Sequence, residues 1–159
     1  TAPCAAQGME TSVSLRELTL EDFPLRTFDK LRYADMDRQG HVNNAVFSTF
    51  LETGRTELLY TGETPLAGPG SAFVLARLML EFRAEVHWPG EVAIGTRVRD
   101  LGRSSIKLEQ VIFQNGRRVA NADTVIVMVD TTTRRARSLP DDVVARLKAF
   151  MPQSETAGT

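Results

Sequence analysis

The sequence predicts an α+β domain in which one long helix lies on one face of a mostly antiparallel sheet. Three observations support this prediction. Apolar residues recur at helical spacing from about Ala45 onward, and a long alternating segment covers residues 72–88. The pair Asn115-Gly116 then marks a tight hairpin between two further strand-like segments.

The first elements are an extended segment, residues 25–33, a polar loop and the helix. The helix places five residues on one stripe that we expect to pack on the sheet: Phe47, Phe50, Leu51, Gly54 and Leu58. Glu52 and Arg55 are displaced from this stripe, and their i, i+3 spacing predicts an ion pair on the helix flank. Glycines and prolines between residues 62 and 70 end the helix.

The strands follow. Every even position from Ala72 to Trp88 is apolar, which predicts a strand with one buried face. After a turn at Pro89-Gly90, a second long strand includes Val92 to Val98 and ends near residues 100–103. A third strand, residues 104–114, and a last strand, residues 117–130, flank the Asn115-Gly116 turn. The apolar run 125–129 predicts a central strand covered on both faces. Residues 140–150 predict a short terminal helix.

Length and composition fit one domain. The chain has 159 residues, 42% hydrophobic and 25% charged, and we assign the domain to residues 15–151. Residues 1–14 and 152–159, rich in small and polar residues, predict a flexible leader and a flexible tail. Residues 1–8 fit a native extension and an expression remnant equally well.

Charge and cysteine content exclude some functions. Nineteen basic and twenty acidic residues give a net charge of -1, so we expect no nucleic-acid partner and no binding to an anionic membrane surface. The apolar runs are far shorter than a membrane span. The single cysteine, Cys4, has no internal disulfide partner, which fits a reducing compartment. We therefore expect a cytoplasmic protein.

The loop from Tyr33 to Asn44 carries the densest chemistry, because it crowds two carboxylates, an imidazole and two amides around Gly40. It lies between two regular elements, a place that functional residues favour. Asn43 or Asn44 can cap the following helix, whose first N–H groups carry a partial positive charge. The helix start therefore suits an anion or a polarised carbonyl.

The run Tyr33-Ala34-Asp35-Met36-Asp37-Arg38-Gln39-Gly40-His41-Val42-Asn43-Asn44, with Glu52 and Arg55 after it, resembles a family signature. It is similar to that of the hotdog-fold acyl-CoA thioesterases of the 4-hydroxybenzoyl-CoA thioesterase group. The resemblance extends from about Leu25 to about Asp130, because the order of loop, helix and strands also matches. It implies a curved, mostly antiparallel sheet wrapped around one long central helix, and hydrolysis of an acyl-CoA thioester without a cofactor.

The resemblance also assigns roles in the loop. Asp37 is expected to attack the thioester carbonyl directly or to act as general base on water. The alternative is a purely structural role, in which Asp37 forms an Asx turn within the loop. Tyr33 lies near the family site or serves as a core aromatic. His41 positions water or the thioester, or holds the loop. Asn43 and Asn44 orient the reactants or cap the helix. One branch of the family has histidine at position 44, and this chain does not.

Substrate binding is expected to involve two subunits. The resemblance implies that the hairpin residues Arg103, Ser104 and Ser105 contact coenzyme A phosphates from a neighbouring subunit. Phe47 and Phe73 are expected to line the acyl pocket, which suits aliphatic and aromatic groups equally. A backbone N–H at the helix start or near residues 71–73 of the other subunit would bind the carbonyl oxygen. A sheet wrapped around one helix leaves a face or an edge uncovered, which predicts a homodimer or homotetramer.

Other functions fit less well. Residues 35–40 imitate half of a calcium loop, but its twelfth position is Val46 in place of the required glutamate. Two histidines and one cysteine make a zinc site improbable, so we expect no metal. A magnesium phosphotransferase would need alternating strands and helices. Two alternatives remain: a thioesterase for acyl-carrier-protein esters, docking an acidic partner near Arg103, and a non-catalytic acyl-CoA binding module.

Overall fold

A computed structural model describes residues 17–152. The predicted leader, residues 1–14, and the predicted tail after Pro152 lie outside the described residues. The elements in chain order are η1 (Leu20–Asp22), β1 (Leu25–Lys30), η2 (Tyr33–Asp35), α1 (Asn44–Tyr60), β2 (Ser71–Phe82), β3 (Glu91–Leu101), β4 (Ser105–Gln114), β5 (Arg117–Asp130) and α2 (Asp141–Lys148).

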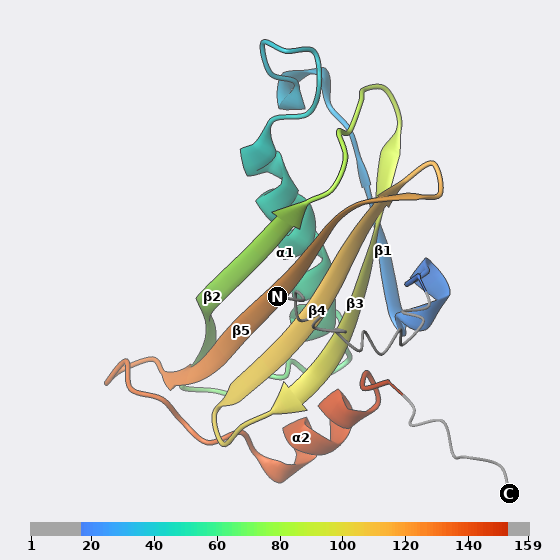
Figure 1. Ribbon diagram of the computed structural model, residues 1–159. Helices are drawn as coiled ribbons and strands as arrows, with labels where there is room; N and C mark the ends of the chain where they lie inside the picture. The colour runs from blue at the N-terminus through green and yellow to red at the C-terminus, as the bar shows by residue number, and fades with distance from the viewer. Residues whose placement is uncertain (1–16, 153–159) are drawn as a thin grey trace, which may run out of the picture.

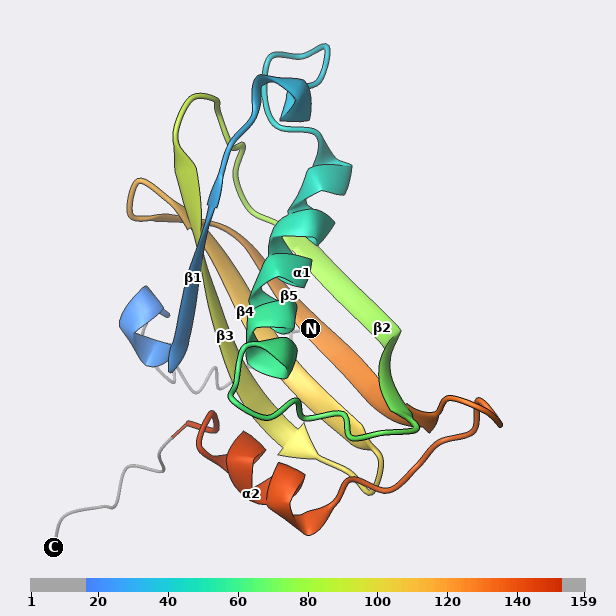
Figure 2. The same ribbon diagram turned by 180° about the vertical axis from the view of Figure 1, so that it is seen from behind.

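The strands form one antiparallel sheet in the order β1-β3-β4-β5-β2. The sheet curves around α1, which lies on one face, while α2 lies at one end of the sheet (Figures 1 and 2). β1 and β2 are therefore the edge strands of the described sheet. This arrangement confirms the predicted fold, a curved antiparallel sheet wrapped around a long helix.

Helix α1 packs against β1, β3 and β4 through the predicted stripe. Gly54 brings the helix close to the sheet, since a Cβ built there would lie 2.8 Å from Thr96 Oγ1 and 2.9 Å from Ile94 Cγ2. The Gln110 amide donates to the Leu51 carbonyl and to Thr96 Oγ1, both at 3.0 Å. Because Gln110 and Thr96 are fully buried, these bonds tie the helix to the sheet interior.

The predicted ion pair between Glu52 and Arg55 is wrong. Arg55 is 7% exposed, and its Nη1 has no hydrogen-bond partner. Burial lowers the pKa of the Arg55 guanidinium, an effect that the negative charge of Glu52 partly offsets. Helical spacing alone could not show this, because Arg55 lies one residue after Gly54, about 100° around the helix, where its long side chain still reaches the protein interior.

The strand predicted over residues 72–88 ends at Phe82, so its last six residues are wrong. The backbone N–H groups of Arg83 and Ala84 both donate to the Val119 carbonyl, at 2.8 and 3.1 Å, and the pairing with β5 stops there. The chain then turns toward the polar loop, where the Val42 N–H donates to the Val86 carbonyl at 2.8 Å. Alternation continued by chance into a segment that packs on the loop.

The other strand predictions are close to the structure. Asn115 and Gly116 have φ values of 51° and 76°, as a type I′ hairpin requires. Strand β5 is interior, between β4 and β2, although Val125 and Val127 on its outer face are only partly covered. Helix α2 occupies the predicted terminal position, after Pro140. Within residues 17–152, no helix is long and apolar enough to cross a membrane.

Candidate active site

The polar loop folds back on itself at Asp37–His41. The Asp37 N–H donates to the His41 carbonyl at 2.8 Å, and the Gly40 N–H donates to the Asp37 carbonyl at 3.2 Å. Gly40 has a φ of 86°, a conformation that residues with a side chain rarely adopt. Met36 and Val42 then pair as an antiparallel bridge. The turn therefore places the Asp37 and His41 side chains close together.

The Asp37 carboxylate uses both of its oxygens. Oδ1 accepts a hydrogen bond of 2.8 Å from the Gln39 N–H, which is the predicted Asx turn, and Oδ2 lies 3.3 Å from His41 Nδ1. The Asp37 side chain is 23% exposed, so solvent and small molecules reach it. The two predicted roles of Asp37 are therefore compatible, because one oxygen shapes the turn while the other faces an imidazole.

His41 belongs to a row of four titratable side chains. Its Nδ1 faces Asp37, and its Nε2 lies 3.7 Å from Glu85 Oε1. Glu85 Oε2 in turn lies 3.3 Å from His87 Nε2. Sequence reasoning missed Glu85 and His87 because it placed them on the wet face of a strand. The available signals were that His87 is the second of only two histidines and that the turn at Pro89-Gly90 follows it closely.

Asp35, the other loop carboxylate, is buried and has a structural environment. It is 3% exposed, and its oxygens accept hydrogen bonds from the Arg32 N–H, Nε and Nη2. The Asp35 carbonyl also accepts a bond from the Asn43 N–H. These contacts hold the start of α1 against the loop and leave Asp37 as the accessible carboxylate of the pair.

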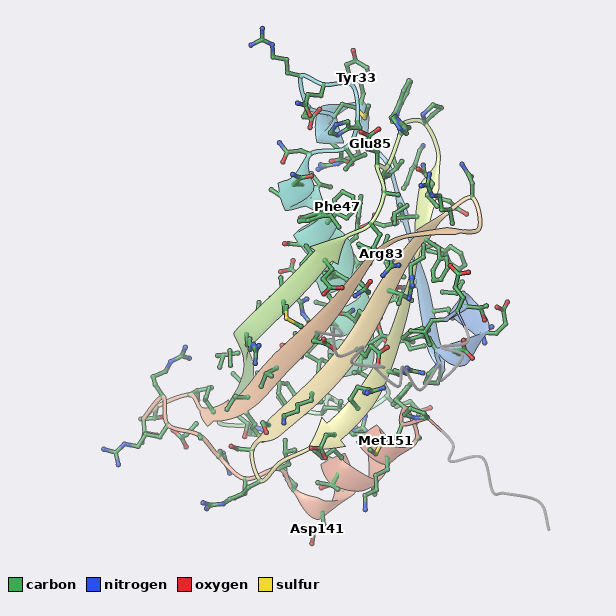
Figure 3. All side chains as sticks on the ribbon, viewed as in Figure 1. Tyr33, Phe47, Arg83, Glu85, Asp141 and Met151 are labelled. Atoms are coloured by element: carbon green, nitrogen blue, oxygen red, sulfur yellow. The ribbon has the colours of Figure 1, made fainter. Side chains whose placement is uncertain are left out.

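The remaining predicted loop residues lie around the helix start. Asn43 is the N-cap of α1, and its Oδ1 accepts a 2.9 Å hydrogen bond from the Ala45 N–H, whereas Asn44 is the exposed first residue of the helix. Tyr33 is 76% exposed and meets Trp88 edge to face, with ring centroids 5.4 Å apart. Figure 3 shows Tyr33, Glu85 and Phe47 at one end of the molecule and Asp141 and Met151 at the other.

Phe47 forms an apolar wall beside the loop. It is 2% exposed and packs edge to face on Phe82 at a centroid distance of 5.0 Å. Phe82 is itself 50% exposed, so one side of this wall is open.

Comparisons with known proteins identify the family to which the chain belongs. Residues 31–147 match the family model described as the thioesterase-like superfamily. The chain belongs to this superfamily. It is 27% identical to the acyl-CoA thioester hydrolase YbgC of Escherichia coli O6:H1 over 134 residues, which cover 82% of this chain and 97% of YbgC. It is 24% identical over 131 residues to the chloroplastic acyl-acyl carrier protein thioesterase ATL3 of Arabidopsis thaliana, covering 79% of this chain and 68% of ATL3.

Among solved structures, the chain is similar to a thioesterase from Thermus thermophilus complexed with coenzyme A and zinc. The TM-score is 0.73 with 30% identity, over 84% of this chain and 98% of the other. These findings confirm the predicted hotdog fold, the predicted family and the predicted class of enzyme, a thioester hydrolase. Within residues 17–152, no three His, Cys, Asp or Glu side chains converge as a metal site, so the row through His41 is not a metal cage.

Within this thioesterase-like chain, the predicted site residues lie in two separate groups. Phe73 pairs with Met128 and packs in the apolar cluster beside α2. Ser105 pairs with Val127, whose neighbour on β2 is Val74, so the hairpin of Arg103, Ser104 and Ser105 lies at that same end. From Phe73 to Phe82, β2 spans roughly 30 Å at about 3.3 Å per residue. The structure therefore does not bring these residues to Asp37 within one chain.

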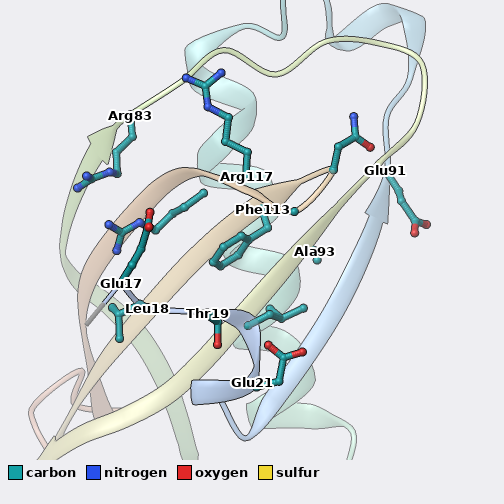
Figure 4. Close-up of a pocket in the computed structure, with 13 residues that line it drawn as sticks. Glu17, Leu18, Thr19, Glu21, Arg83, Glu91, Ala93, Phe113 and Arg117 are labelled. Carbon is teal, nitrogen blue, oxygen red and sulfur yellow. The ribbon is translucent and has the colours of Figure 1, made fainter. Parts of the chain in front are cut away.

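A hollow of about 960 Å³ lies away from the loop, on the sheet face opposite α1. Figure 4 shows Glu17, Glu21 and Glu91 in its wall together with Arg83 and Arg117, around Phe113. Its acidic and basic groups offset each other, and it contains neither Asp37 nor His41. We therefore assign the candidate site to the loop and the start of α1, not to this hollow.

Proposed function

We propose that this protein is an acyl-CoA thioesterase that hydrolyses its substrate to a free acid and coenzyme A at Asp37. The observation that supports this most directly is the accessible Asp37 carboxylate, held between the Gln39 N–H and the His41 ring in the loop that precedes helix α1. The names of two similar proteins, an acyl-CoA thioester hydrolase and a thioesterase complexed with coenzyme A, support the same substrate class.

In this mechanism Asp37 acts in one of two ways. As general base it takes a proton from water while the water oxygen bonds to the thioester carbonyl carbon. As nucleophile it forms a mixed anhydride that water then cleaves. In both routes the carbon–sulfur bond breaks and the thiolate leaves and takes up a proton, while backbone N–H groups stabilise the carbonyl oxygen. In ¹⁸O-water, label found in Asp37 after a single turnover would identify the nucleophile route, since only attack of water on the Asp37 carboxyl carbon of the anhydride places label in that side chain.

The test of the function is thiol release from a panel of aliphatic and aromatic acyl-CoA esters. Matched acyl-carrier-protein esters test the alternative that ATL3 suggests. Faster turnover of the carrier-protein esters would show that the substrate is an acyl-carrier-protein ester and not an acyl-CoA ester. Binding of the esters without any thiol release would indicate a binding module and end the proposal. We further propose a cytoplasmic location, which the absence of a disulfide partner for Cys4 supports.

We propose that the active unit is a homodimer, or a tetramer built from two such dimers, joined along β2. Leu75 and Phe82 are each 50% exposed on the α1 face of this edge strand, where Leu75 pairs with the buried Ile126. Thr53 bonds to Asp29 of β1 on one flank of α1, so Arg55 leaves the helix on the other flank, toward β2. Three features favour cover by a second copy: exposed apolar groups, the open edge of the 12-residue strand β2 in the described sheet, and the buried Arg55 Nη1, which lacks a hydrogen-bond partner.

Such a dimer would explain the division of the site. Antiparallel pairing of two β2 edges places the Phe73 end of one strand beside the Phe82 end of the other. The hairpin of Arg103 and its two serines would then lie near the Asp37 loop of the partner.

Leu75→Glu should abolish the dimer and, because the site is shared, lower thiol release by at least about tenfold, since a charge cannot be buried unpaired at little cost. Light scattering coupled to gel filtration measures the mass. Met79→Glu is the matched control, because Met79 is 43% exposed on the same strand but pairs with the exposed Asp123 on the other face. A dimeric, active Leu75→Glu variant would contradict this interface.

Arg103→Ala should raise KM for acyl-CoA several-fold and leave KM for a pantetheine thioester, which lacks the nucleotide, unchanged. The reason is that Arg103 is exposed at the hairpin, where its Nε donates a 2.8 Å hydrogen bond to Ser138 Oγ. The guanidinium is thereby oriented to bind a phosphate of coenzyme A. Steady-state kinetics on both esters measure the difference. Arg135→Ala, in the exposed turn after β5, is the control, and equal effects of Arg103→Ala on both esters would rule out a phosphate contact.

A further inference from the structure

The row of side chains through His41 continues beyond the groups that the proposed mechanism uses. Asp37 and His41 are 23% and 17% exposed, whereas Glu85 and His87 are 63% and 60% exposed. The row therefore runs from the sheltered turn to the surface. It ends in a carboxylate and an imidazole, Glu85 and His87, to which neither the loop signature nor the mechanism gives a role.

The His41 ring has two competing partners at one nitrogen. Nδ1 lies 3.3 Å from Asp37 Oδ2 and 3.5 Å from the Val42 carbonyl, and both distances are long for a hydrogen bond. A ring held only at Nδ1 can swing between these acceptors. A charge on the Nε2 side can restrict this swing, and Glu85 Oε1, at 3.7 Å, is the charged group there: it lies beyond hydrogen-bond distance but close enough for electrostatic attraction to a protonated ring.

The backbone holds Glu85 in place although its side chain is exposed. On one side, the Ala84 N–H donates to the Val119 carbonyl, and on the other, the Val86 carbonyl accepts the Val42 N–H of the loop itself. Val86 is fully buried. The Glu85 Cα is therefore held in place relative to His41, which keeps the carboxylate within reach of the His41 ring.

His87 is held in a similar way. Its N–H donates to Gln114 Oε1 at 3.1 Å, and its carbonyl accepts from Gln114 Nε2 at 2.7 Å. This pair of bonds ties the segment to the end of β4. His87 Nε2 then faces the second oxygen of Glu85, so each Glu85 oxygen has one imidazole partner.

We propose that Glu85 is a positioning residue of the thioesterase site, which holds the His41 ring in the orientation that faces Asp37 and is itself oriented by His87. The inference rests on the proposed function. Glu85 touches no reacting atom and acts only through His41, whose ring nitrogens both face carboxylates and can both donate only when the ring carries two protons. Because ion pairs of this exposure contribute little, we expect a moderate effect on turnover.

Glu85→Gln should lower kcat about 3- to 10-fold with KM unchanged, since it keeps the shape of the side chain and removes its charge. Glu81→Gln is the matched control, because Glu81 lies four residues earlier and bonds to Asn121 Nδ2 instead of an imidazole. In a His41→Gln background, Glu85→Gln should have no further effect on kcat, which is the coupling expected of residues that act through one another. An equal loss in both backgrounds would overturn the proposal.

Nitrogen NMR of the histidine rings tests the inference without turnover. The chain has only two histidines, so His87→Gln assigns both sets of ring signals. Glu85→Gln should shift the His41 ring nitrogens and Glu81→Gln should not; unshifted His41 signals would refute the positioning role. If the wild type releases no thiol from any ester, the proposed function fails, while this measurement still decides whether Glu85 orients His41.

Discussion

Asp37→Asn should lower kcat for thioester hydrolysis by about 10²-fold or more and leave the fold intact. An asparagine Oδ1 still accepts the bond from the Gln39 N–H, so the turn at Asp37–His41 persists. What is lost is the negative oxygen at 3.3 Å from His41 Nδ1, and with it the base or nucleophile. Initial rates of thiol release, together with a circular dichroism spectrum, measure both halves of the expectation.

Asp123→Asn is the control for this experiment, because Asp123 is an exposed carboxylate on the sheet face opposite α1. It should keep wild-type kcat. Asp37→Asn with a wild-type rate and a wild-type spectrum would remove Asp37 from the chemistry and leave it only the role of shaping the turn.

Gly54→Val should lower the free energy of unfolding by roughly 2–3 kcal/mol, a typical cost of overpacking a close contact. Any Cβ at this position would lie 2.8 Å from Gln110 Nε2 and Thr96 Oγ1 and 2.9 Å from Ile94 Cγ2. These side chains are fully buried and cannot move aside, so α1 must shift away from the sheet. For a domain of this size the melting temperature should fall by about 5–10 °C.

Urea unfolding followed by circular dichroism measures the Gly54→Val effect. Gly68→Val supplies the comparison, because nothing lies within 4 Å of a Cβ at Gly68 and its φ is not positive. It should change stability by less than about 0.5 kcal/mol, as surface substitutions usually do. A Gly54→Val midpoint equal to that of Gly68→Val would show that α1 does not pack on the sheet through this glycine.

The sequence pattern predicted those parts of the fold that depend on interactions between residues close together in the chain. The α1 stripe from Phe47 to Leu58 and the Asn115-Gly116 turn depend on spacing and backbone preference within a few residues, and both are present. The end of β2 depends instead on a distant group, the Val119 carbonyl, which two successive N–H donors share. Alternation in the sequence carries no information about such a partner.

The contacts of the candidate site also divide into those set by nearby residues, which the sequence indicated, and those set by distant residues, which it did not. The contact of Asp37 with His41 follows from a five-residue turn around Gly40, so a contiguous signature could indicate it. Glu85 reaches His41 only because β2 leaves the sheet early, and Arg55 is buried only because of how α1 lies on the sheet. These arrangements arise from tertiary packing, which the sequence pattern did not contain.

The distance between the two halves of the site has a consequence in the cell. On the proposed dimer, a newly synthesised chain carries the catalytic carboxylate of one active site and the nucleotide-binding hairpin of the other, and completes neither. The first chains made would be inactive until they dimerise. The fraction of chains in dimers would rise with protein concentration, and the activity per chain would rise with it. The expression level would therefore set the specific activity as well as the amount of this enzyme.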